Sequence, residues 1–123
     1  MPAPDLPGVL QTVVDVATFI GAAAVTGFIG NRFDAVARRL FLSVRDRWRA
    51  RARTSGDALT EEEAVDAATA AAIVAGYEPD DIHRFSAVPQ DDGSWLVMLR
   101  ADGDELRATV PPGDPENARI LIV

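Results

Sequence analysis

The feature that most limits how this chain can fold is an almost uninterrupted apolar run from Val9 to Gly30. The second part of the run, from Val16 to Gly30, carries no charged residue. A stretch of about 20 apolar residues matches the hydrocarbon thickness of a bilayer, and Pro7 and Gly8 lie where such a helix would begin. The sequence therefore predicts one long apolar helix, which either crosses a membrane or is covered by other protein.

Polar and small residues recur along one side of this predicted helix. Gln11, Asp15, Thr18, Ala22 and Thr26 follow one another at three- to four-residue spacing. Gly21 and Gly27 each follow an alanine by four residues, a spacing that lets two helices approach closely. We predict that four residues mediate helix association: Asp15, Thr18, Gly21 and Gly27.

After Gly30 the pattern becomes that of a basic amphipathic helix. An apolar ridge recurs at helical spacing, and it consists of Phe33, Val36, Leu40, Phe41, Val44 and Trp48. Two interpretations are open: the helix lies on an anionic membrane surface, or its ridge packs on its own protein beneath a solvated Arg face. The membrane hypothesis assigns the lipid interface to Arg38, Arg39, Arg45 and Trp48.

The charge of the chain divides into two unequal parts. Residues 1–53 hold eight Arg against four acidic residues, a net charge of +4, and residues 54–123 hold four Arg against fifteen, a net charge of −11. We therefore predict a helical segment over 1–53, a linker over 54–58 and an acidic α+β interaction domain over 59–123. Because the arginines follow the apolar run, a spanning helix would leave the acidic domain in the cytoplasm of a bacterial cell, at its inner membrane.

The sequence of residues 59–123 predicts one helix followed by short strands, so the predicted fold class is α+β. Thr60 and Glu63 form a capping box, and the helix runs to Gly76 with Val65, Ala68, Ala72 and Ile73 on its buried face. Strands are expected over 83–88, 94–101, 105–110 and, as a fourth strand or a tail, 118–123. The result would be one helix on an antiparallel sheet of three or four strands. Because the 120–123 end is so apolar, we expect it to pair within the fold or with a partner.

The order of these elements, with the turn from Asp92 to Trp95, is loosely similar to that of the small helix-plus-sheet modules of PepSY-like domains. The resemblance lies in the order of the elements, and it implies no functional residue.

The residue types needed for common active sites are scarce. There is no Cys, and His83 is the single histidine, so neither a thiol nucleophile nor a pair of His ligands for zinc can be built. Asp91, Asp92, Asp102 and Asp104 do not have the spacing of an EF-hand loop, and hairpin turns account for them. We therefore predict no catalytic, cofactor-binding or metal-binding residue and no enzymatic activity. The acidic half also argues against a nucleic-acid partner.

Three functions remain as hypotheses. The first is a non-catalytic, membrane-associated interaction or scaffold protein of a bacterium that self-associates through its N-terminal helix and presents the acidic domain to a protein partner. The second is a soluble homo-oligomer or filament subunit, cytoplasmic, whose apolar helices form the core of the assembly. The third is a small pore-forming protein of holin or toxin type with Asp15, Thr18 and Thr26 in its lumen.

Overall fold

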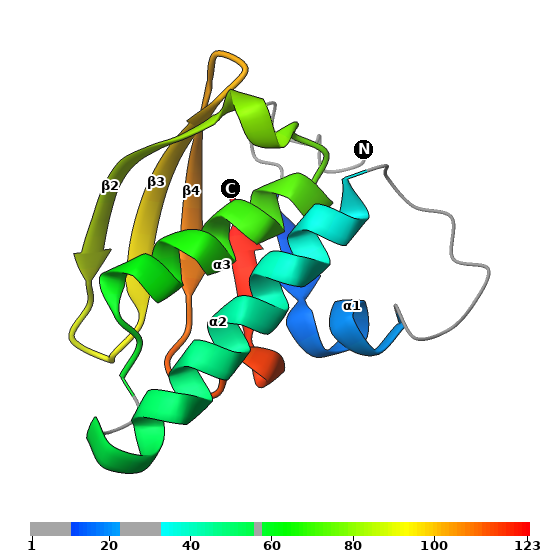
Figure 1. The fold of residues 1–123 in the computed structure, drawn as a ribbon. Helices are drawn as coiled ribbons and strands as arrows, with labels where there is room; N and C mark the ends of the chain where they lie inside the picture. The colour runs from blue at the N-terminus through cyan, green and yellow to red at the C-terminus, as the bar shows by residue number, and fades with distance from the viewer. Residues whose placement is uncertain (1–10, 23–32, 56–57) are drawn as a thin grey trace, which may run out of the picture.

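The computed structural model of the protein describes residues 11–22, 33–55 and 58–123. These residues form an α+β fold, which confirms the predicted class (Figure 1). The helices are α1 (Val16–Ala22), α2 (Asp34–Ser55) and α3 (Glu61–Val74). The strands are β1 (Thr12–Asp15), β2 (Ile82–Pro89), β3 (Trp95–Ala101), β4 (Asp104–Val110) and β5 (Arg119–Ile122), with short 3-10 turns η1 (Pro79–Asp81) and η2 (Pro115–Asn117).

The sheet has five strands in the order β1-β5-β4-β3-β2, so the expectation of three or four strands was wrong. All four pairings are antiparallel. The additional strand is β1, which lies in the segment where a helix was expected. Val14 of β1 pairs with Ile120 of β5, which confirms that the apolar end of the chain pairs within the fold.

The predicted continuous helix over 9–30 was also wrong for the residues that the structure describes. Thr12 to Asp15 form a strand, and α1 is a short helix that ends at Ala22. Thr12, Val13 and Val14 are β-branched, which favours an extended backbone, and β5 offers a free edge to this segment. In the described part of the chain, no helix is both long and apolar enough to cross a membrane.

Helix α3 has the ends that its sequence predicts. The Thr60 side chain accepts a hydrogen bond from the Glu63 amide, and the Glu63 side chain accepts one from the Thr60 amide, which completes the capping box. At the other end Gly76 has a φ of +117°, and the amides of Gly76 and Tyr77 bond back to Ile73 and Ala72 as in a Schellman motif.

The small side chains of α3 are explained by its position between two neighbours. Figure 1 shows α2 and α3 side by side on one face of the sheet, and α3 contacts β2, β3, β4 and β5. Six alanines are therefore buried on different sides of α3: Ala64, Ala67, Ala68, Ala70, Ala71 and Ala72.

Helix α2 packs its apolar ridge into the same core. Phe41 and Val44 are at most 1% exposed, and the Phe41 ring meets Phe19 of α1 edge to face with centroids 5.8 Å apart. Residues before and after the predicted linker thus contribute to one hydrophobic cluster. Of the two interpretations of the ridge, the structure shows the one in which it packs on its own protein.

The β3–β4 connection sets the register between these two strands. Asp102 and Gly103 both have positive φ, +53° and +81° respectively, as a two-residue type I′ hairpin requires. With this register Val97, Leu99, Ala108 and Val110 point toward the helices and are buried. Because side chains alternate along a strand, the residues between them point to the opposite, outer face of the sheet.

Candidate interaction surface

Three of the four residues predicted for helix association, namely Asp15, Thr18 and Gly21, lie in β1 and α1. Asp15 ends β1, where its carboxylate accepts a hydrogen bond from the Thr18 amide and lies 3.8 Å from Nε of Arg119. Thr18 and Gly21 are exposed on the short helix α1, and nothing approaches within 4 Å of the Cβ position of Gly21. Gly27 lies outside the described residues. Their role in association stays a prediction.

The residues predicted for a membrane interface lie on α2. Trp48 is partly buried and packs against the core, whereas Arg39 is exposed. Within the described part of the chain, Nε of Arg38 is buried and donates no hydrogen bond. Nη2 of Arg45 lies 3.0 Å from an Asp46 oxygen, and its Nη1 lies 3.7 Å from Glu116. A lipid interface at these positions stays a prediction.

Several arginines of α2 are engaged with acidic residues of the second half of the chain. Nη2 of Arg47 lies 2.6 Å from an Asp66 carboxylate oxygen. Nη2 of Arg49 donates to Asp114 and Glu116 at 3.1 and 2.6 Å, and the hydrogen bond to Asp114 raises the pKa of Arg49. Part of the opposite charge of the two halves is therefore paired within the molecule, between α2 and acidic residues of α3 and η2.

The most buried of these pairs joins Arg51 and Glu63. The Glu63 side chain is 5% exposed and the Arg51 side chain 25% exposed, with Nη2 and Oε1 2.8 Å apart. Arg51 also donates to the Ala58 carbonyl. Oε1 of Glu63 also accepts a hydrogen bond from the Thr60 amide at 3.0 Å, so this carboxylate connects the end of α2 to the start of α3.

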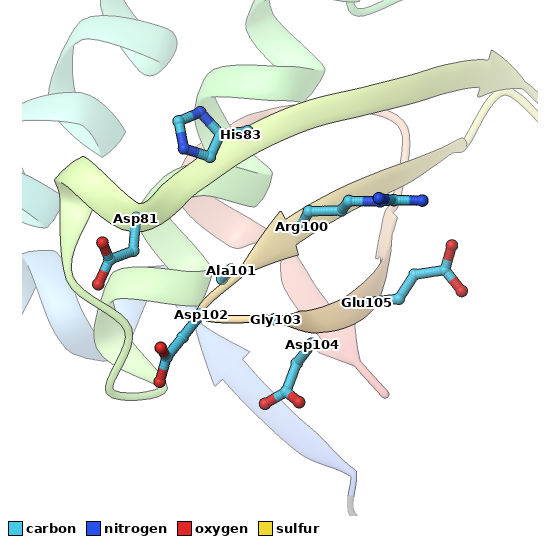
Figure 2. Close-up of a pocket in the computed structure, with 8 residues that line it drawn as sticks. All are labelled: Asp81, His83, Arg100, Ala101, Asp102, Gly103, Asp104 and Glu105. Carbon is cyan, nitrogen blue, oxygen red and sulfur yellow. The ribbon is translucent and has the colours of Figure 1, made fainter.

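A polar hollow of about 380 Å³ lies at the β3–β4 turn. Its lining includes His83, Arg100 and four acidic side chains, namely Asp81, Asp102, Asp104 and Glu105. Figure 2 shows that these side chains diverge, with Asp102 and Asp104 directed away from His83. Among the described residues no group of three His, Asp or Glu is placed to hold a metal ion. General acid–base chemistry needs groups that converge on one point, and this arrangement does not provide them.

The outer face of the sheet carries a feature that the sequence pattern did not predict. The strand registers align Val88 with Leu96, Leu96 with Thr109, Thr109 with Leu121, and Leu121 with Val13. One row of side chains thus crosses all five strands, and we call it the transverse row: Val13, Leu121, Thr109, Leu96 and Val88. Val13 and Val88 are 58% and 49% exposed, and the other three are partly exposed.

A second hollow opens over one half of this row. It has a volume of about 620 Å³ and is lined by Val88, Leu96 and Thr109 together with the β2–β3 turn, residues 89–92 and Ser94. In the turn, the amide and the hydroxyl of Ser94 donate to Asp92 at 2.9 and 2.6 Å. These bonds lower the pKa of the Asp92 carboxyl, with the hydroxyl making the larger contribution.

Comparison with known proteins adds no homologue to this picture. No family model, curated protein or solved structure matches the chain. The candidate site therefore rests on the geometry of the molecule.

The alternation of apolar residues in β3 was visible in the sequence, and it placed Leu96 and Met98 together on one side of that strand. The transverse row was not visible, because it depends on the register of five strands from both ends of the chain.

Proposed function

We propose that the protein is a non-catalytic interaction protein that associates with copies of itself through the outer face of its sheet. The observation that carries the proposal is the transverse row, which none of the described helices covers. Soluble proteins rarely leave a contiguous apolar band on a sheet exposed unless another surface covers it.

The charges on this face favour a second copy as the partner. Arg100, Arg107 and Arg119 lie on the outer face, and their side chains alternate with acidic groups such as Glu105. A face that carries both signs can be complementary to an equal face, whereas a strongly basic or acidic partner would meet like charges. Self-association also belongs to the first two functions expected from the sequence.

Membrane attachment is not part of this proposal. The expectation relied on residues 9–30, of which 9–10 and 23–30 lie outside the described residues. It also relied on the Arg face of α2, where Arg47, Arg49 and Arg51 are paired with acidic residues. It stays a prediction, which flotation of the full chain with anionic vesicles would test.

Sedimentation of the full chain between about 1 and 200 µM tests the proposal. We expect the mean mass to rise with concentration above that of one chain, and we expect Leu96→Glu to abolish the rise because it puts a charge into the row. The matched control is Ala50→Glu, which adds the same charge at an exposed position of α2. Circular dichroism should show both variants folded.

Two results would contradict the proposal. One is a parent chain that stays monomeric over the whole concentration range. The other is association that survives Leu96→Glu and is lost when Gly21 and Gly27 are replaced by Leu, which would assign it to the N-terminal segment instead.

A further inference from the structure

The transverse row has a symmetric composition. Read across the sheet from β1 to β2, it is Val13, Leu121, Thr109, Leu96 and Val88, so the sequence of residue types is the same from either edge. The centre of symmetry is Thr109 on the middle strand, β4. A closed dimer uses the same patch on both copies, and a patch that is symmetric about one line is suited to a two-fold axis along that line.

We propose that two copies pack their sheets face to face about a two-fold axis that runs along β4. This inference rests on the proposed function and specifies its geometry. The axis places Thr109 on Thr109, Leu96 of one copy against Leu121 of the other, and Val88 against Val13. Two stacked sheets lie about 10 Å apart with strands within about 30° of each other, so these side chains meet at the middle of the interface.

The next row of the sheet fits the same axis. Arg107 pairs with Met98 on one side and exchanges backbone hydrogen bonds with Val123 on the other. The axis therefore places Met98 of one copy against Val123 of its partner, and Val123 is 40% exposed. It also brings two Arg107 side chains together, and Glu105, two residues away on the same face, supplies the opposite charge for each.

The hollow and the charge beside it are complementary as well. The axis carries the β1–β5 half of one sheet onto the β2–β3 half of the other, so Val13 and Leu121 enter the hollow over Val88 and Leu96. Arg119, whose side chain is 77% exposed, then lies opposite Ser94 and next to the exposed turn residues Asp91 and Asp92. The two-fold axis repeats this charge pairing at both ends of the interface.

The size of the face indicates a weak dimer. Five strands at a spacing of about 4.8 Å and three outward residues per strand cover on the order of 500 Å² per copy, or roughly 1,000 Å² in total. This is below the area of a standard stable interface, so we expect dissociation in the micromolar range and a dependence on concentration.

Cross-linking distinguishes this axis from the alternatives. The chain has no Cys, so each introduced thiol is the only one. Val13→Cys and Val88→Cys replace exposed residues at opposite edges of the sheet, and a bismaleimide with a span of about 10 Å matches the distance between stacked sheets. We expect an equal mixture of the two variants to give the mixed cross-linked dimer, and each variant alone to give little, because equal positions are about 19 Å or more apart.

The possible outcomes test the position of the two-fold axis separately from the existence of self-association. Cross-linking of each variant with itself, without enrichment of the mixed product, would overturn the axis along β4 and indicate an axis across the strands, while the proposed function would stand. An absence of both kinds of product, in samples whose parent chain associates in sedimentation, would also overturn the proposed face-to-face contact. A parent chain that does not associate would contradict the proposed function. Thr109→Cys, on the axis, provides a further check. Of the three single variants, only this one should cross-link efficiently with itself.

Discussion

At the scale of single residues, Glu63 both caps α3 and pairs with Arg51 of α2. Its carboxylate accepts hydrogen bonds from the Thr60 amide and from both terminal nitrogens of Arg51, and it is 5% exposed. A buried carboxylate is tolerated only when its partners satisfy it. The same partners depend on Glu63 in return, because its loss would leave the guanidinium of Arg51 partly buried without a counter-charge.

We expect Glu63→Ala to lower the free energy of unfolding by about 2 to 4 kcal/mol, since it removes both a helix cap and one partner of a largely buried ion pair. Glu62→Ala is the matched control: Glu62 pairs with Arg84 at 3.2 Å, but its side chain is 71% exposed, so its loss should cost less than about 1 kcal/mol. Urea unfolding of the two variants measures the difference. Equal losses would show that the Glu63 contacts contribute no more than a surface pair.

The Asp92 carboxyl is expected to make a contribution to the free energy of unfolding that depends on pH. The Ser94 hydroxyl and amide lower the pKa of Asp92 in the folded state. A carboxyl whose pKa is depressed by folding stabilises the fold above its unfolded pKa, and this contribution is lost as the pH falls through the folded pKa. We expect Ser94→Ala to raise the pKa of Asp92 toward its ordinary value and to reduce the loss of stability in acid. Titration of the carboxyl carbon by NMR checks the pKa; an unchanged value would contradict the assigned cause.

At the scale of elements, β1 and α2 attach the described part of the first half of the chain to the rest of the fold. Both elements carry apolar residues that could face lipid or another chain. In the structure, α2 places Phe41 and Val44 in the core, and its arginines meet the carboxylates of α3 and η2. Because exposed ion pairs contribute at most about 1 kcal/mol each, the apolar ridge is the stronger of the two attachments.

The two valines in the middle of β1 test its assignment as a strand. Val14 faces the helices and is 4% exposed, whereas its neighbour Val13 is 58% exposed on the outer face. Val14→Ala should therefore lower the free energy of unfolding by about 1 to 3 kcal/mol, and Val13→Ala by less than about 0.5 kcal/mol. Urea unfolding at a concentration at which the chain is monomeric checks both values. Similar losses at the two positions would argue against the alternation that β1 requires.

At the scale of the whole molecule, self-association predicts that thermal stability depends on concentration. A dimer of folded chains stabilises the folded state by mass action, and the unfolded chain gains nothing. Above the dissociation constant, we expect the midpoint of thermal unfolding to rise by about 2 to 5 °C for each tenfold increase in concentration. The midpoint of Leu96→Glu should not change, and calorimetry over two decades of concentration compares the two. A parent midpoint that is independent of concentration would contradict the proposal.

The elements that could be predicted from the amino-acid sequence are those whose signals lie within a few residues of one another. Thr60 and Glu63 predicted the start of α3, Gly76 its end, and the residues from Asp102 to Asp104 a tight turn between β3 and β4, because caps and tight turns are local hydrogen-bonded structures. The structure shortens this turn to Asp102 and Gly103. Residues far apart in the chain decided the rest. The segment from Thr12 to Asp15 is apolar enough for a helix, and it is a strand because β5, from the other end of the chain, offers it a free edge. The transverse row has the same origin, since it exists only where the tertiary structure aligns five strands in one register.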